Sequence, residues 1–233
     1  MTSNVLLAVL AVVGVLLLFA PVALQSFVVS RARKAAIISE PAEAVPGGGW
    51  PVAGAFQAVG FVPVGAVRIV APSVPEQHCL LLAAPEVASF ARLWVGPDGK
   101  TGGYSLQSPL PFGTLVTGVD AVDAMTDHEL LQVFPGADPQ HLLDRHLDAQ
   151  WFLASLGVQG LPVHPADADA RFRAEWAEEL EAVGRRGMGF TIGLAYRSAL
   201  KLPKHKGPLA EQKGIVEHVR RLQGSAGTTP PTR

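Results

Sequence analysis

The fold is decided by residues 87–108, which read VASFARLWVGPDGKTGGYSLQS. Two runs rich in valine, leucine and aromatic residues flank residues 96–100, where a proline, an aspartate and two glycines cluster. Such runs favour β-strands, and such a cluster favours a tight turn between them. A short turn sets two strands side by side in opposite directions. The segment therefore predicts a β-hairpin within an antiparallel sheet.

Similar short runs lie on both sides of this hairpin, separated by Gly, Pro and Asp. They cover 60–70, 78–85, 113–121 and 129–134, and a short helix or turn is expected at 51–58. The first half of the chain is therefore expected to be rich in β-structure.

Beyond residue 135 the pattern becomes helical. Asp138 and Pro139 are typical of a helix start, and apolar residues then recur at helical spacing up to Gly157. Two further helices are expected, from Asp167 to Gly184 and over 208–222. The second helix carries four glutamates that we interpret as solvated surface: Glu175, Glu178, Glu179 and Glu181. Residues 188–194 alternate apolar residues with glycine and threonine, which permits a short strand. Strands followed by helices predict an α+β fold.

Residues 5–29 are the most apolar part of the chain, with 21 of 25 residues apolar. No charge occurs in the run that includes Val5, Leu10, Val15, Phe19 and Leu24. About 20 helical residues span about 30 Å, the thickness of a bilayer core. A buried globular helix rarely lacks a polar face over this length, and a cleaved signal peptide needs a basic start that residues 1–4 lack. The pattern predicts a single transmembrane anchor at 1–30.

Arg31, Arg33 and Lys34 follow this apolar run directly. Because Lys and Arg stay on the cytoplasmic side, we expect the N-terminus outside and the domain in the cytoplasm of a cell-membrane protein. An extracytoplasmic domain is the alternative.

The remaining chain divides into three parts by composition. Residues 31–50 combine the basic flank with a stretch rich in Pro and Gly, which predicts a tether. Residues 51–222 are expected to form the α+β domain, β-rich over 51–135 and α-rich over 136–222. Residues 223–233 read as a disordered tail.

The net charge of −1 conceals an uneven distribution of charge. Residues 36–184 carry 18 acidic and 6 basic side chains, whereas residues 185–233 carry 2 acidic and 10 basic ones. The basic end could pack on its own acidic domain, bind anionic lipid, or bind an acidic partner. Nucleic acid is the least favoured partner, because few aromatic residues lie among the basic ones. The residues concerned are Arg197, Lys201, Lys204, Lys206, Lys213, Arg220 and Arg221.

Known catalytic and cofactor motifs do not occur in the sequence. Residues 96–101 resemble the end of a phosphate-binding loop, but two residues rather than four separate the glycines. Neither a serine-hydrolase elbow nor a dinucleotide fingerprint is present, so no cofactor is expected. The single cysteine, Cys79, excludes a disulfide framework and is expected to pack as a small apolar residue.

Two polar clusters are the weaker candidates for a site. Asp120, Asp123, Asp127 and His128 lie within ten residues of one another, but their spacing matches no calcium loop. His141 and His146 are five residues apart on a predicted helix, so they face different directions and do not form a zinc pair. We expect a solvated loop at the first place and no metal site at either.

These features predict a non-enzymatic adaptor, scaffold or accessory subunit at the cytoplasmic face of a membrane, with the bilayer and a protein as its partners. The alternative is a membrane-tethered enzyme or small-ligand-binding domain whose site is assembled from distant residues. A pocket with converging polar groups would favour the alternative, and a flat apolar or basic face would favour the adaptor.

Overall fold

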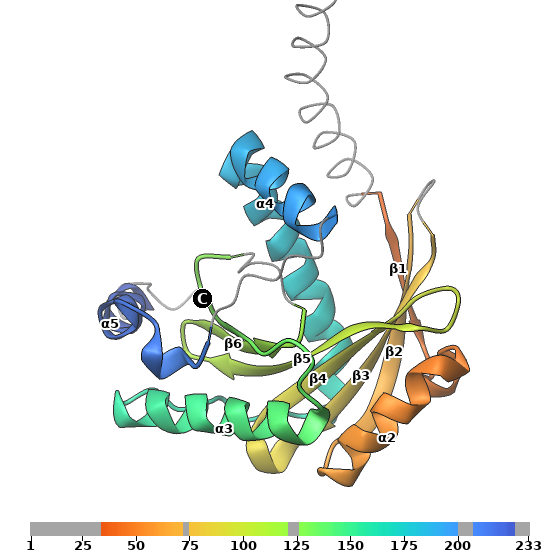
Figure 1. Cartoon of the computed structure of the whole chain (residues 1–233), viewed down its shortest axis with the longest axis horizontal. Helices are drawn as coiled ribbons and strands as arrows, with labels where there is room; N and C mark the ends of the chain where they lie inside the picture. The colour runs from red at the N-terminus through yellow and green to blue at the C-terminus, as the bar shows by residue number, and fades with distance from the viewer. Residues whose placement is uncertain (1–33, 72–74, 121–125, 200–206, 227–233) are drawn as a thin grey trace, which may run out of the picture.

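The structure of the chain is a computed structural model that describes residues 34–71, 75–120, 126–199 and 207–226 (Figure 1). The predicted anchor lies outside these residues, as do Arg31 and Arg33. Over the described ranges, no helix has the length and apolar character needed to cross a membrane.

The described strands form one sheet in which chain order is also spatial order. They are β1 (Ala36–Glu40), β2 (Val62–Val70), β3 (Gln77–Ala84), β4 (Ser89–Val95), β5 (Thr101–Leu110), β6 (Gly113–Gly118) and β7 (Glu129–Val133). The predicted hairpin is confirmed between β4 and β5, where Gly96 N–H donates to Lys100 O at 2.9 Å. Gly99 has a φ of 76°, a conformation that glycine adopts without strain. The turn chemistry of residues 96–100 therefore fixes the centre of the sheet.

The last pair of strands departs from the antiparallel expectation. β7 runs parallel to β6, with Thr114 opposite Glu129 and Gly118 opposite Val133. Ten residues, 119–128, separate the end of β6 from the start of β7. A tight turn would have reversed the strand, whereas a connection of ten residues is long enough to return beside a pairing of only five residues.

The prediction of a flexible tether over 35–50 is wrong. Residues 36–40 form β1, which pairs along its whole length with β2. Two 3-10 turns, Ala42–Ala44 and Gly47–Gly49, then lead into the helix α2 (Trp50–Ala58). Val45 is 3% exposed, and a Cβ at Gly49 would lie 2.7 Å from Val95 Cγ2. Val45 and Gly49 therefore pack closely against the domain, and the segment is part of the fold.

The helices cover both faces of the sheet (Figure 1). α2 and α3 (Pro139–Ser155) lie on the first face, where Phe56 and Leu142 join a core with Leu80 and Leu93 of the sheet. α5 (Ile215–Ala226) packs beside the end of α3, over β6 and β7. α4 (Ala168–Ala199) lies on the second face. The predicted α+β architecture is confirmed for the described residues.

Two helices have other bounds than predicted. α4 continues through residues 188–194 to Ala199, so the short strand is wrong there. Extending a helix that is already docked adds one backbone hydrogen bond for each residue, which offsets the cost of its glycines. The last helix begins at Ile215, after the 3-10 turn Leu209–Glu211 and Gly214 with a φ of 74°. It ends at Ala226, inside the predicted tail, whose last seven residues lie outside the described ranges.

Buried hydrogen bonds fasten α3 to the sheet. His146 of α3 is fully buried, with Nε2 2.8 Å from Ser108 Oγ on β5 and Nδ1 2.7 Å from Thr117 Oγ1 on β6. The Ser108 hydroxyl donates to Ala88 O at 2.9 Å, so its oxygen can accept from His146 Nε2. Thr117 then donates to Nδ1, which assigns a neutral imidazole protonated at Nε2.

The network continues through Gln132 of β7. Its Nε2 donates to Thr117 Oγ1 and to Arg145 O, both at 2.8 Å, and its Oε1 accepts from the backbone N–H of Leu209 at 3.0 Å. Both donors and the acceptor of this buried amide are therefore satisfied. One side chain joins β6, β7, α3 and the turn before α5.

Burial lowers the pKa of His146 to about 3, because the charged imidazolium would lose its hydration. In an unfolded chain the histidine titrates near 6.5. The folded protein therefore binds fewer protons than the unfolded one between these values, and its stability falls as pH falls through this range. From pH 7 to pH 5 the loss is about 2 kcal/mol, at about 1.4 kcal/mol per pH unit below 6.5.

We predict that His146→Phe destabilises the protein at pH 7 by about 2–4 kcal/mol, because Ser108 and Thr117 lose their partner. Phenylalanine does not titrate, so the difference from the wild type should shrink by about 2 kcal/mol at pH 5. Denaturant unfolding at the two pH values measures this, with the exposed His164→Phe as control. A difference that stays constant with pH would contradict the assignment of a neutral histidine.

A second prediction concerns the start of β6. A Cβ at Gly113 would lie 2.1 Å from His128 O, at the point where Thr114 N–H donates to that carbonyl. Gly113→Ala should therefore push β7 from β6 and cost about 1–3 kcal/mol of unfolding free energy. A Cβ at Gly224 in α5 would have no other atom within 4 Å, so Gly224→Ala should be neutral or stabilising by up to about 1 kcal/mol. Denaturant unfolding of both variants measures the contrast, and equal effects would contradict the close approach at Gly113.

Candidate functional site

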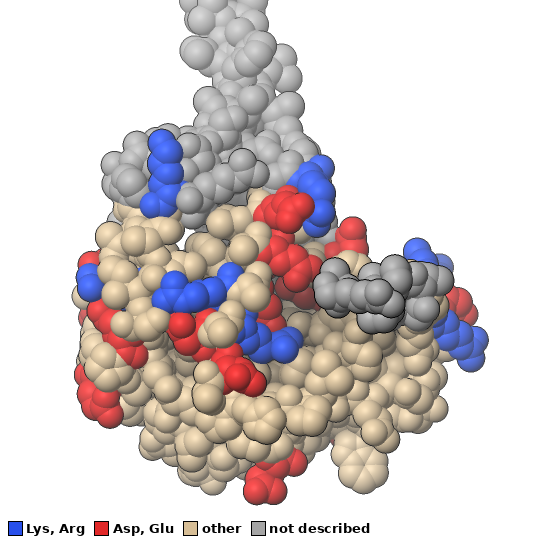
Figure 2. Space-filling view, turned by 180° about the vertical axis from the view of Figure 1, so that it is seen from behind, with Lys and Arg blue, Asp and Glu red and all other residues tan. Residues whose placement is uncertain are grey.

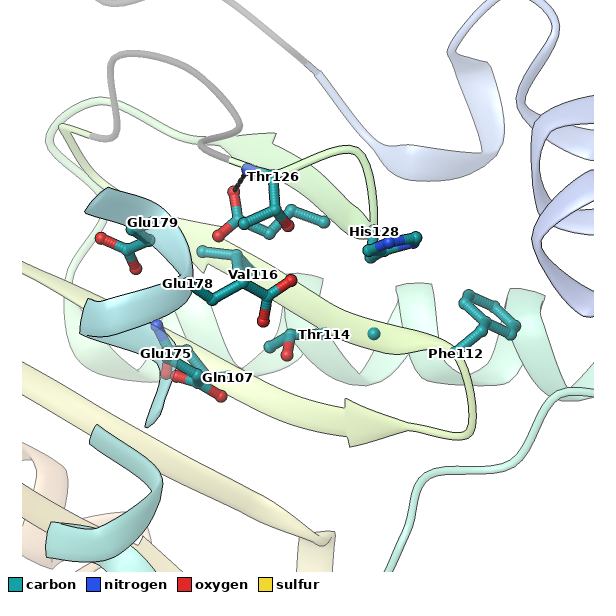
Figure 3. Close-up of a pocket in the computed structure, with 11 residues that line it drawn as sticks. Gln107, Phe112, Thr114, Val116, Thr126, His128, Glu175, Glu178 and Glu179 are labelled. Atoms are coloured by element: carbon teal, nitrogen blue, oxygen red, sulfur yellow. Dashed lines mark hydrogen bonds between the residues drawn. The ribbon is translucent and has the colours of Figure 1, made fainter. Parts of the chain in front are cut away.

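A cavity of about 260 Å³ opens between α4 and the last strands, on the second face of the sheet (Figure 3). Gln107 of β5 and Thr114 and Val116 of β6 form its floor. Thr126, His128 and Glu129, at the start of β7, line one side. The wall from α4 consists of Glu175, Glu178 and Glu179. Phe112 and His128 lie at the end of the cavity away from the glutamates of α4 (Figure 3).

Local structure explains why these side chains converge. Gln107 pairs with Val116, and Thr114 lies two residues earlier on β6, so all three share one face of the sheet. The glutamates of α4 are three and four residues apart, which places them on one side of the helix. The parallel course of β7 then brings His128 beside Gly113, at the open end of the cavity.

Arg92 is the charged group that holds α4 against this region. It lies on β4 with 7% exposure, and its Nη2 contacts Glu175. Its Nη1 lies 3.9 Å from Glu179 Oε1, and its guanidinium stacks 4.8 Å above the ring of Phe172. Arg171 also contacts Glu175, with Nε 2.8 Å from Oε1. Seen from this face, acidic and basic side chains lie next to one another (Figure 2).

The cavity nevertheless holds more negative than positive charge. The negative charge of Glu175 is compensated by two arginines, Arg92 and Arg171. Glu179 lies 3.9 Å from Arg92, too far for a hydrogen bond. The pKa of Glu179 is raised to about 7, chiefly by burial. Arg92 opposes this rise, and the nearby carboxylates of Glu129, Glu175 and Glu178 add to it. Glu178 is exposed and has no ion-pair partner among the described residues. Among the described residues, the four glutamates that line the cavity outnumber the two arginines, Arg92 and Arg171, that contact glutamates of α4 there.

Such an arrangement suits a ligand that carries positive charge and several N–H donors. Carboxylates are acceptors only, and hydrogen bonds between an ammonium or guanidinium group and a carboxylate are among the strongest in proteins. The carboxylate acceptors come from α4 and from Glu129 at the start of β7, so a donor between them would bridge two elements. Among the described residues, no group of three or more His, Cys, Asp or Glu side chains is arranged to hold a metal ion.

The structure separates the predicted polar cluster. Only His128 of that cluster lines the cavity. Asp127 is exposed, and Asp123 lies outside the described residues. Asp120 is exposed and lies against Gly103, where a Cβ would be 2.0 Å from Asp120 Oδ2. The three described members of the cluster, Asp120, Asp127 and His128, therefore do not form one site.

The predicted basic contact residues are also divided. Lys213, Arg220 and Arg221 are exposed in or beside α5. Lys34, which belongs to the predicted basic flank, is exposed just before β1. Arg197 belongs to α4. Lys201, Lys204 and Lys206 lie outside the described residues.

The glutamates of α4 are the part of the site that sequence reasoning missed. We interpreted Glu175 and Glu179 as solvated surface, but they face the sheet because Arg92 is there. The available signal was an arginine inside the apolar run of β4, since a buried cation requires an acidic partner. The interpretation of Cys79 is confirmed: it is fully buried, and burial raises the pKa of its thiol to about 12.

No protein-family model, curated protein or solved structure matches this chain. Function is therefore inferred from the chemistry of the site itself.

We predict that Glu179→Gln stabilises the protein at pH 8 by about 1–3 kcal/mol and has little effect at pH 5. The carboxyl is protonated in the folded state up to about pH 7, so its ionisation costs stability as pH rises from 4.5 through 7. Its side chain is 27% exposed, which reduces the effect below the full value of the pKa shift. Unfolding midpoints at both pH values measure this, with the exposed Glu181→Gln as control. Destabilisation at pH 8 would show that the contact with Arg92 outweighs burial.

Proposed function

We propose that the chain is a single-pass, membrane-anchored binding protein whose cytoplasmic domain takes a positively charged side chain of a partner protein into the acidic cavity. The observation that carries this proposal is the convergence of Glu175, Glu178 and Glu179 with Glu129 on one cavity. Converging polar groups in a cavity, one with a raised pKa, are the mark of a binding site. The proposal joins the expected adaptor role with a defined recognition site.

The size of the cavity supports a side chain rather than a larger ligand. Pockets for drug-sized ligands are about 300–1,000 Å³, and the cavity has about 260 Å³. An arginine or lysine side chain projecting from another protein would fill much of it. Its charge would offset the mutual repulsion that raises the pKa of Glu179.

The start of β1 supports a position close to the bilayer. β1 begins at Ala36, two residues after Lys34, so the anchor predicted over 1–30 would hold the domain at the membrane surface. The basic residues that precede β1 favour the cytoplasmic side. A partner bound there would be brought to the membrane, which is the role of an adaptor.

The test compares two ligands that differ in charge but little in shape. N-acetyl-arginine amide should raise the melting temperature of the full chain at millimolar concentration, and the citrulline analogue should not. The effect should be greater at pH 8 than at pH 6, because Glu179 ionises between them. Glu178→Gln should weaken binding about tenfold, since a charge-assisted hydrogen bond contributes about 1.5 kcal/mol or more.

Glu181→Gln serves as the matched control, because Glu181 lies on the same helix and pairs with Arg185 outside the cavity. Equal stabilisation by arginine and citrulline amides, or equal loss in both variants, would contradict recognition of a cation by this cavity.

A further inference from the structure

Contacts between β1 and α4 fix the direction in which α4 runs. Asp169, in the first turn of α4, accepts from Ser39 Oγ at 3.1 Å. Arg173, one turn later, donates through Nη1 to Ile37 O at 2.8 Å and through Nη2 to Ser39 Oγ at 2.6 Å. α4 therefore runs from the end of β1 toward its beginning.

α4 is far longer than this contact requires. Arg173 is already level with Ile37, and β1 begins at Ala36. The helix continues from Arg173 for 26 residues to Ala199, which corresponds to about 39 Å at about 1.5 Å per residue. Its last turns and the first residues of β1 lie at the same end of the molecule (Figure 1). This is the end at which the chain enters the domain from residues 1–33.

The sequence of α4 changes character along its length. Residues 168–184 include five acidic residues, and this half forms the wall of the cavity. Arg185 and Arg186 follow, then ten residues without any charge over 187–196, and then Arg197. Helices that lie at a membrane surface combine Lys or Arg with bulky apolar residues. Residues 185–199 combine three arginines with Phe190, Ile192 and Leu194. Arginines of such helices remain among lipid phosphates while the apolar part enters the boundary of the acyl chains.

We infer that the second half of α4, residues 185–199, lies in the headgroup layer of an anionic leaflet and forms a membrane contact separate from the anchor. This inference rests on the proposed anchor, because the chain leads toward the anchor at the same end of the domain as the last turns of α4. Arginines within this layer are attracted to anionic lipids. Two contacts would hold the domain in one orientation at the membrane surface.

The inference also divides the basic residues of the chain into two groups. Lys213, Arg220 and Arg221 belong to the segment of α5, which packs over β6 and β7 through Ile215, Val219 and Leu222. That segment lies away from the start of β1 (Figure 1). These three residues should not contact the same leaflet, although the sequence alone groups them with Arg197.

The test uses the full chain reconstituted in vesicles of phosphatidylcholine with or without phosphatidylglycerol. A Cys79→Ala background, in which the native cysteine is removed from the core, receives Ile192→Cys or, as the matched site on α5, Glu217→Cys. A fluorophore at residue 192 should be quenched by nitroxide-labelled lipid and protected from aqueous iodide in the anionic vesicles. The fluorophore at residue 217 should show the reverse.

Two triple variants remove the same charge from different places. Arg185→Gln, Arg186→Gln and Arg197→Gln together should reduce lipid quenching at residue 192 several-fold. Lys213→Gln, Arg220→Gln and Arg221→Gln together should leave it unchanged. Equal effects of the two variants would overturn the assignment to α4.

Flotation of the same vesicles separates this inference from the proposed anchor. A chain that floats with both vesicle types but exposes residue 192 to iodide would overturn the α4 contact and leave the anchor standing. A chain that floats only with anionic lipid, with residue 192 quenched by lipid, would support the α4 contact without the anchor. A chain that floats with neither would overturn both.

Discussion

The need to satisfy buried polar groups at His146 is the constraint on which the first face of the sheet depends. This imidazole is fully buried and is bonded to β5 through Ser108 and to β6 through Thr117. Gln132 extends the network to β7 and to the turn before α5. A shift of β7 by one residue would turn Gln132 to the other face of the sheet. Its hydrogen-bond partners on β6, on α3 and before α5 would then be buried without a partner. The network therefore selects the parallel register of β7, which apolar contacts alone would specify less strictly.

Arg92 plays the corresponding part on the second face. A guanidinium on a central strand must be paired when it is buried, and Glu175 and Glu179 of α4 provide that pairing. The helix is thereby held with its acidic side toward the sheet. Two arginines cannot compensate all the carboxylates that this orientation gathers, and the raised pKa of Glu179 is the result. The ion pairs that dock α4 and the excess charge that suits a cationic ligand thus have the same origin.

The two halves of α4 make different contacts. Its first half bonds to β1 and forms the wall of the cavity, while its second half extends past the start of the sheet. Since β1 begins two residues after Lys34, a single helix connects the proposed binding site to the side of the domain nearest the predicted anchor. A ligand in the cavity and a lipid surface at the far end would then contact the same helix. The position of the binding site relative to the membrane would therefore be fixed by this helix and not by a flexible linker.

By itself, the sequence determined the features that depend on neighbouring residues. The turn at 96–100, the short apolar runs that form strands and the start of α3 at Asp138 follow from local conformational preference, and all three are found. Tertiary structure decided what depends on distant partners. Residues 35–50 read as flexible because sequence does not show that Val45 and Gly49 pack against the sheet. The cavity likewise needs β6, β7 and α4 together. Glu179 differs from a solvated glutamate because folding partly buries it beside Arg92 and three other carboxylates.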